Sequence, residues 1–390
     1  MIENIFKKDV KIFFDELKKK HFKKNNLKLH EPVFSKNTFR HIHNCIKSTF
    51  VSPNGKYNKL LEKKLKKITN SKFVICLNSG TSALFISLKS IGIEKNDEVL
   101  LPSLTFVSTA NAVLYNNAIP HFVDTSERTL AIDPILLEKY LKEISVIRNG
   151  KLINKKTKRH IKCLICVHVF GNSAEITKIR NICKKYNLLL IEDAAEALNS
   201  YYKGKHLGTF GKVGILSFNG NKIITSGSGG AILTNDKKIF DYCNHITSNA
   251  KITDKWEYKH DMIGYNLKMA NINAALAFAQ ILDLNKIQKD KNKLMIKYKN
   301  FFKKDNLKVE LITPLKNSKS NNWLISIKLK NEMSKKKNII LNFLWKNKIY
   351  ARPLWTPLHK LKYLSKFPRS HLNNTNKLYE TIISLPSGPK

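Results

Sequence analysis

Short apolar runs alternate with helical patterns through the first two-thirds of the chain. Runs rich in β-branched and other apolar residues predict strands at 72–77, 97–102, 119–124, 162–170, 188–193, 213–218 and 230–235. Between them, apolar residues recur at helical spacing over 82–93, 107–117 and 176–187. This alternation is typical of an α/β domain with a mainly parallel sheet. Such sheets bind ligands at the carboxyl ends of their strands, so those ends are where we look for chemistry.

The pattern changes after residue 264. One long helix is expected over 264–304, with one apolar face made of Leu284, Ile287, Leu294, Tyr298 and Phe301. A strand within 321–329 and a helix over 338–349 then indicate a smaller α+β domain. We therefore expect a large α/β domain over 31–270 and a small C-terminal α+β domain over 271–390.

Two basic segments stand outside this alternation. Residues 1–30 form a lysine-rich extension with helical spacing at Val10, Phe14 and Leu17, and it is either a docking arm or a frayed terminus. Residues 147–162 are expected to form a basic hairpin loop. Neither segment is assigned any chemistry.

The charge balance is strongly basic, with 70 Lys and Arg against 29 Asp and Glu, a formal net charge of +41. The lysines are spread along the chain and do not form the clustered footprint of a nucleic-acid binder, so a nucleic-acid ligand is the less favoured interpretation. A basic nucleic-acid-binding protein stays as the alternative from another functional class. A basic field would still attract a phosphorylated substrate. No apolar run is long enough for a membrane helix and the amino terminus does not resemble a signal peptide, so a cytoplasmic protein without a membrane partner is expected.

Six cysteines show no disulfide framework. Cys163 and Cys166 form a CxxC pair, but they lie in a predicted buried strand. Positions three apart on a strand point to opposite faces, so the two thiols cannot bind one metal ion. No metal site is expected.

A candidate phosphate site follows the first strand. Gly80 permits a tight turn, and Thr81 and Ser82 open the next helix. Free backbone N–H groups, hydroxyls and the positive end of the helix dipole attract anions there. Simple N-capping of the helix by Ser or Thr explains the same residues equally well.

Three further candidates sit at strand ends. Asp193 ends an apolar strand, where a carboxylate must be paired or hydrogen-bonded, whereas neighbouring Glu192 points to the other face. Ser217 ends a later strand, and a short turn after it can bring Lys222 back over the sheet edge. A desolvated lysine there is suited to forming an imine. The alternative is that Lys222 is one more exposed lysine.

Taken together, these residues resemble the DegT/DnrJ/StrS sugar aminotransferases, fold-type I enzymes that use pyridoxal phosphate. The resemblance covers most of the chain from about residue 50. It rests on the stretches NSGTSAL, VHVFG, IEDAAEALNSYYKGKHLGTFG, LSFNGNKIITSGSGGAILTND and GYNLKMANINAALAFAQ. Two others, SFNGNK and ARPLWTPLHK, are more similar to the LegC-type branch, which aminates nucleotide-linked 4-keto-6-deoxy-N-acetylhexosamines.

The resemblance implies a role for each candidate. Lys222 would form the imine with the cofactor and move the proton. Asp193 would hold the pyridinium nitrogen, Phe106 would stack on the ring, and Glu196 would lie near the ring hydroxyl. The cofactor phosphate would be bound by Gly80, Thr81, Ser82 and Ser217, and by Asn266 of a neighbouring subunit in a homodimer.

The resemblance also implies the substrates, L-glutamate as amino donor and a nucleotide sugar as acceptor. Arg352 and His359 are candidates for the sugar-nucleotide wall, although packing explains them equally well. Leu267 and Lys268 depart from the family's usual aromatic residue and arginine, and lysine does not reproduce bidentate arginine contacts. A catalytically silent member of the fold is therefore an alternative. A dehydratase of the same superfamily would carry His in place of Lys222.

Overall fold

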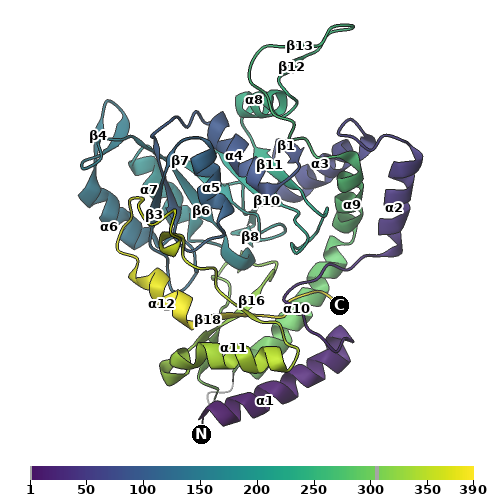
Figure 1. The fold of residues 1–390 in the computed structure, drawn as a ribbon, viewed down its shortest axis with the longest axis vertical. Helices are drawn as coiled ribbons and strands as arrows, with labels where there is room; N and C mark the ends of the chain where they lie inside the picture. Colours follow the sequence, from purple (N-terminus) through teal and green to yellow (C-terminus); the bar gives the residue numbers. More distant parts are fainter. Residues whose placement is uncertain (1, 304–306) are drawn as a thin grey trace.

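A seven-stranded sheet forms the centre of the computed structural model, which describes residues 2–303 and 307–390 (Figure 1). The strand order is β1-β11-β10-β7-β6-β2-β3. Six strands are parallel, and β11 runs antiparallel to both of its neighbours. The strands are β1 Phe73–Leu77, β2 Glu98–Pro102, β3 Ile119–Val123, β6 Ile161–Val167, β7 Leu189–Asp193, β10 Val213–Ser217 and β11 Gly230–Thr234. The predicted mainly parallel α/β sheet is confirmed.

Helices cover both faces of this sheet, because alternate strand residues are apolar on each side. One face packs on α4 Gly80–Ser90, α5 Ser108–Tyr115 and α8 Lys237–Ile246. The other packs on α3 Lys56–Thr69, α6 Pro134–Ile144, α7 Ile176–Lys185 and α9 Asn271–Leu282. Cys163 lies in the core of the first face and Cys166 in that of the second, as their spacing predicts. All six cysteines are buried and free.

A second, smaller sheet lies below the first in Figure 1. Its antiparallel strands run in the order β14-β16-β18-β17. They are β14 Val309–Leu311, β16 Ile325–Leu329, β17 Arg352–Pro353 and β18 Ile382–Leu385, with helices α10 Leu284–Phe301, α11 Lys337–Lys346 and α12 Asn373–Thr381 and the 3-10 turns η4 Asn331–Lys336 and η5 Leu358–Lys360. The fold-type I arrangement of a large α/β part and a smaller α+β part is confirmed, whereas the boundary near residue 270 remains a prediction.

The expected single helix over 264–304 is wrong in one respect. The structure has two helices, α9 and α10, which meet at Asp283. The backbone of Asp283 has φ −88° and ψ 0°, and its N–H donates to Gln280 O in a tighter turn. The break lets α9 pack on α2, Lys36–Lys47, and on α3, while α10 joins the smaller part.

The amino-terminal segment is helical and docked. Helix α1, Ile2–Leu17, runs into a short π-helical turn, η1 Lys18–Phe22, and lies beside α11 in Figure 1. Phe6, Val10 and Phe14 are buried among the apolar residues of α10 and the small sheet. Ring centroids of Phe14 and Tyr298 are 6.1 Å apart. Of the two alternatives, the docking arm is the one observed.

The remaining elements are short. A basic hairpin is present as β4 Ser145–Arg148 and β5 Lys151–Asn154, so it begins two residues before the predicted range, and residues 161–162 of that range belong to β6. Helix α2 covers Lys36–Lys47, and the others are η2 Val169–Gly171, β8 Tyr201–Tyr202, β9 Lys205–His206, β12 Lys251–Ile252, β13 Lys259–His260 and β15 Ser318–Lys319. Hairpin β12–β13 projects from the body of the chain (Figure 1). Within 2–303 and 307–390, none of the helices combines the length and apolarity needed to cross a membrane.

Candidate active site

A cavity of about 270 Å³ opens at the carboxyl ends of β7 and β10. The location is the one that parallel sheets favour for ligands. Seven of the predicted site residues line it, namely Gly80, Thr81, Phe106, Asp193, Glu196, Ser217 and Lys222. They come from distant parts of the sequence, and the fold brings them to one place.

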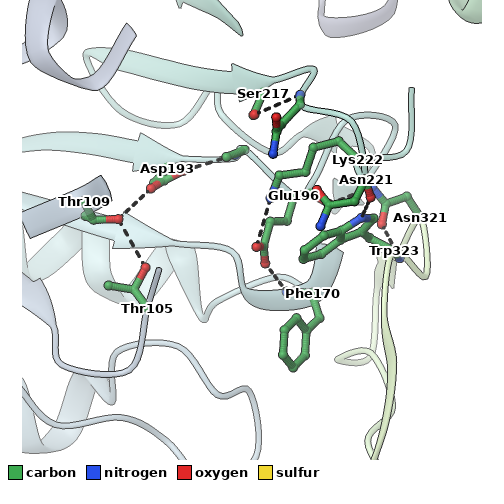
Figure 2. Close-up of polar contacts among 12 residues, drawn as sticks. Thr105, Thr109, Phe170, Asp193, Glu196, Ser217, Asn221, Lys222, Asn321 and Trp323 are labelled. Atoms are coloured by element: carbon green, nitrogen blue, oxygen red, sulfur yellow. Dashed lines mark hydrogen bonds and ion pairs between the residues drawn. The ribbon is translucent and has the colours of Figure 1, made fainter. Parts of the chain in front are cut away.

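Lys222 lies in the loop that joins β10 to β11. Its N–H donates to Asn219 O at 3.0 Å, a turn that directs the side chain back over the sheet edge. The ammonium Nζ is 3.2 Å from Glu196 Oε1 and 4.0 Å from the ring centroid of Trp323 (Figure 2). Only 13% of the side chain is exposed, so the alternative of an ordinary surface lysine is wrong.

Asp193 ends β7 and is 5% exposed. Its Oδ2 accepts from Thr109 Oγ1 at 3.0 Å and its Oδ1 accepts from the Ala195 N–H at 3.2 Å (Figure 2). Burial raises the pKa of this carboxyl group, and the hydrogen bonds from Ala195 and Thr109 oppose that rise. A buried carboxylate at the edge of the cavity is suited to pairing with a cationic group of a ligand.

Glu192 faces the opposite side of the sheet, as the strand alternation predicts. It is fully buried and pairs with His168 Nε2 at 2.9 Å. The backbone N–H groups of Gly208 and Gly211 also donate to it, at 2.9 and 2.7 Å. Glu192 is therefore part of the support beneath the site and does not line the cavity.

Glu196 is the direct partner of Lys222. Its Oε2 accepts from the Phe170 N–H at 2.8 Å, which leaves Oε1 for the lysine. Burial raises the pKa of the Glu196 carboxyl group, and the nearby Lys222 charge opposes the rise. The sequence indicated Glu196 only through the family resemblance and gave no sign of its contact with Lys222.

The turn before α4 caps the helix at Ser79 and lets Ser217 approach closely at Gly80. Ser79 caps the helix, since its Oγ accepts from the Ser82 N–H at 3.0 Å. Ser82 Oγ donates to Asn78 Oδ1 at 2.7 Å, and Ser82 lines a neighbouring recess and not the cavity. At Gly80, a methyl group would come within 3.0 Å of Ser217 Cβ. The glycine therefore lets the helix terminus approach Ser217 closely.

Besides Ser82, three predicted residues do not line the cavity within the described part of this single chain. Asn266 is exposed and forms an isolated bridge with Ser248. Arg352 stacks on the Trp345 ring at 4.7 Å. His359 Nδ1 is 2.7 Å from Ser103 Oγ. Their proposed roles therefore depend on another subunit or on bound substrate.

Several lining residues were not predicted from the sequence, among them Thr109, Trp323 and Trp355. Thr109 lies one turn after Phe106, so its helical spacing was a usable signal. Trp323 and Trp355 come from the smaller part of the chain, and no local pattern links them to the sheet edge.

Comparisons with known proteins agree with this geometry. Residues 33–390 match the profile of the DegT/DnrJ/EryC1/StrS aminotransferase family. A GDP-perosamine synthase of Escherichia coli O157:H7 is 32% identical over 343 residues, 88% of each chain. The putative pyridoxal phosphate-dependent aminotransferase EpsN of Bacillus subtilis is 34% identical over 365 residues, 92% of this chain and 90% of that one.

Among solved structures, Helicobacter pylori PseC, an aminotransferase involved in the biosynthesis of pseudoaminic acid, superposes with a TM-score of 0.83. It has 27% identity and 93% coverage of both chains. A putative sugar aminotransferase of Streptococcus pneumoniae, in its PLP form, has a TM-score of 0.82 at 21% identity, with 93% coverage of each chain, which is a likeness of fold. The chain belongs to the DegT/DnrJ/EryC1/StrS aminotransferase family, whose enzymes depend on pyridoxal phosphate.

Proposed function

We propose that this enzyme moves the amino group of L-glutamate to the 4-keto group of a nucleotide-linked 4-keto-6-deoxy-(N-acetyl)hexosamine. One observation carries the proposal: the Lys222 amine is held inside a cavity that also contains the buried carboxylate of Asp193. Relatives named for the same kind of product support the sugar, including a UDP-4-amino-4,6-dideoxy-N-acetyl-beta-L-altrosamine transaminase of Helicobacter pylori, 29% identical over 337 residues. The pathway would make amino sugars for surface glycans of legionaminic or bacillosamine type.

The lining fits pyridoxal phosphate in three places. The Lys222 amine suits the aldehyde carbon of the cofactor, with which it can form an imine. The buried Asp193 carboxyl group suits the protonated ring nitrogen. The turn at Gly80 presents a helix N-terminus beside Ser217, where a phosphate group is favoured. Thr81 completes that end of the cavity, and half-exposed Phe106 supplies an aromatic face for the ring.

Several residues of the chain have separate roles in amino transfer. When bound, the cofactor supplies an electron sink for the carbanion left when the substrate loses its Cα proton. Lys222 Nζ takes and returns that proton, with Glu196 Oε1 at 3.2 Å orienting it. Asp193 keeps a proton on the ring nitrogen, and Thr109 fixes the orientation of the Asp193 carboxyl group. The surrounding apolar side chains exclude water.

We also propose a homodimer with shared sites. Ser82, Ser228 and Lys268 line a second recess of about 350 Å³, which shares Ser79 and Ser228 with the wall of the cavity. Asn266 is exposed, and so are Trp256 and Tyr258 of the projecting hairpin. An exposed aromatic hairpin that projects from the body of the chain is suited to reaching a second copy of the chain. Asn266 would then approach the phosphate of the partner's cofactor.

The first test is an absorbance spectrum of the protein with pyridoxal phosphate. We expect a chromophore that borohydride bleaches, with the label fixed to the Lys222 peptide by mass spectrometry, and that L-glutamate shifts. The Lys222→Ala variant should bind pyridoxal phosphate without forming a covalent bond to it. Lys212 is an exposed lysine at the other end of β10, so the Lys212→Ala variant should behave like the wild type. Absence of a chromophore, or fixation to another lysine, would refute the proposed site.

The acceptor needs its own experiment. Enzyme first converted by L-glutamate is washed and offered UDP-, GDP- and dTDP-linked 4-keto-6-deoxyhexosamines, and the product mass is measured. Formation of an amino sugar from at least one of them, with return of the original spectrum, supports the proposal. If L-glutamate converts the enzyme but none of the keto sugars restores the original spectrum, the acceptor is a different compound.

Shared sites are tested by mixing inactive variants. Lys222→Ala and Asn266→Ala are each expected to be inactive for different reasons. If Asn266 acts across the interface, mixed dimers contain one site with both native residues, and part of the activity returns. Continued inactivity of the mixture, with mixed dimers confirmed by mass, would contradict the shared site.

A further inference from the structure

The indole ring of Trp323 contacts the reactive lysine segment twice. Its Nε1–H donates to Asn221 O, the carbonyl directly before Lys222, at 2.7 Å. Its ring also lies 4.0 Å from Lys222 Nζ, within the range of a cation–π contact. Figure 2 shows the ring beside the lysine side chain. One side chain therefore contacts both the backbone and the amine of this segment.

Trp323 is itself firmly held. It is 3% exposed, and its backbone N–H donates to Asn321 Oδ1 at 2.8 Å. The amide of Asn321 donates in turn to the carbonyl oxygens of Glu196 and Leu198, at 2.8 and 2.9 Å. The indole position is thus fixed relative to Glu196, which is the other contact of the Lys222 amine.

A buried lysine fixes the carbonyl side of Trp323. Lys291 is completely buried and its Nζ donates to Trp323 O at 3.1 Å and to Ser387 O. No carboxylate among the described residues lies within ion-pair distance of this amine, and burial lowers the pKa of Lys291 well below its usual value. Burying such a group without a counter-ion costs stability. The hydrogen bonds of Lys291 are therefore better explained by a role in fixing the position of Trp323 than by a contribution to the free energy of unfolding.

A segment outside the family match lies next to Trp323. The ring of His30 lies 6.5 Å from the indole, and His30 is buried. The carbonyl of the preceding residue, Leu29, accepts from the Ser387 N–H at 2.7 Å. The segment before residue 33 therefore belongs to the packing that holds Trp323.

We propose that Trp323 is a positioning residue that holds the Lys222 amine between the indole ring and Glu196, and that Lys291 fixes Trp323 in that position. This inference rests on the proposed role of Lys222. Without the ring, the lysine side chain would reach more rotamers and solvent would reach its amine. The amine would then react more readily with a small reagent but less often in the geometry that amino transfer needs.

The first test measures lysine reactivity in cofactor-free protein, so it does not depend on the proposed function. Trace labelling with acetic anhydride, read by mass spectrometry, compares the wild type with Trp323→Leu and with Trp345→Leu as a matched control. Trp345 lies in the smaller part but does not line the cavity. We expect Lys222 labelling to rise about fivefold in Trp323→Leu and to stay unchanged in Trp345→Leu. Unchanged labelling in Trp323→Leu would overturn the proposal.

Lys337 serves as the internal reporter of general opening, because it is buried in the smaller part and its Nζ donates to Tyr379 O rather than to Trp323. If Lys337 labelling also rises in Trp323→Leu, the comparison is made with Trp323→Phe, which keeps an aromatic ring and loses the Nε1–H contact with Asn221. A rise of about twofold or more at Lys222 alone then supports positioning, and labelling equal to wild type refutes it.

The second test is single-turnover amino transfer from L-glutamate, followed by absorbance. Trp323→Leu is expected to lower the limiting rate about tenfold, with half-saturation by glutamate changed less than twofold. Equal effects on both constants would indicate a binding role and contradict the positioning role. If wild type forms no chromophore, the proposed function fails, whereas the labelling result still decides the contact between Trp323 and Lys222.

Discussion

Replacing Glu192 by Gln changes almost no volume but should destabilise the protein severely. The carboxylate of Glu192 is fully buried and accepts four hydrogen bonds. Oε2 accepts from His168 Nε2 at 2.9 Å and from the Gly208 N–H at 2.9 Å, and Oε1 accepts from the N–H groups of Phe210 and Gly211 at 2.5 and 2.7 Å. In glutamine, one of the two oxygens becomes an NH₂ group that cannot accept, so two donors lose their partner whichever way the amide is turned.

A change of the His168 tautomer cannot restore a lost hydrogen bond. His168 Nδ1 accepts from the Ala174 N–H at 3.2 Å, so Nε2 must carry the proton that Glu192 accepts. Hydrogen bonds to a charged group contribute about 1.5–3 kcal/mol each, so losing two of them lowers the free energy of unfolding by roughly 3–6 kcal/mol. That is a large part of the roughly 5–15 kcal/mol typical of a folded protein.

Urea unfolding followed by circular dichroism measures this loss. Glu138→Gln is the matched control, since the Glu138–Lys185 pair is exposed and should change the unfolding free energy by less than about 1 kcal/mol. Burial would raise the pKa of Glu192, but the hydrogen bonds from His168 and the backbone lower it. Its contribution is therefore present above about pH 4.5 and lost as the pH falls below that value, so the variant should be less acid-sensitive. A Glu192→Gln protein within about 1 kcal/mol of wild type would refute the reasoning.

Three further predictions concern the site and its support. Asp193→Asn should slow single-turnover amino transfer at least roughly a hundredfold while a borohydride-reducible chromophore still forms; a normal rate would contradict the role. Gly230→Ala would bring a methyl group within 2.6 Å of the backbone of Ser79, so cofactor affinity by titration should fall at least about tenfold, and unchanged affinity would refute the close packing. Burial lowers the pKa of His206 to about 4, and its Nε2 accepts from the Asn199 N–H. The free energy of unfolding should therefore fall as the pH is lowered from about 6.5 to about 4, because the unfolded chain binds the proton at a higher pH than the folded chain does. The His206→Leu variant should show a smaller fall over this range, and a fall equal to that of the wild type would contradict the role of His206.

The sheet and much of the site could be predicted from local sequence. Gly80, Asp193 and Ser217 follow or end apolar strands, and the ends of parallel strands meet at one edge of a sheet. Lys222 follows Ser217 within a single turn, so its approach to that edge is also a local property. The strand at β11 was predicted, but its antiparallel direction was not, because its pairing depends on the length of the loop that carries Lys222.

The rest of the site depends on contacts between distant segments. Trp323 reaches Asn221 from 102 residues away, and no periodicity near either residue indicates that pairing. The contact between Glu196 and Lys222 depends on two loops after different strands. Arg352 was singled out for its charge in a loop, a property that many surface residues share, and it stacks on a neighbouring tryptophan.

The docking of helix α1 has a consequence for synthesis on the ribosome. Its apolar face, which includes Phe6 and Phe14, is translated first, but Tyr298 of α10 follows about 280 residues later. At roughly 5–20 residues per second, that partner emerges roughly 15–60 s after the helix does. During this interval, the nascent chain carries an amphipathic, lysine-rich helix with no surface to cover it. Folding of the smaller part is therefore completed only after α10 has been translated, and helix α1 is a natural binding segment for chaperones until then.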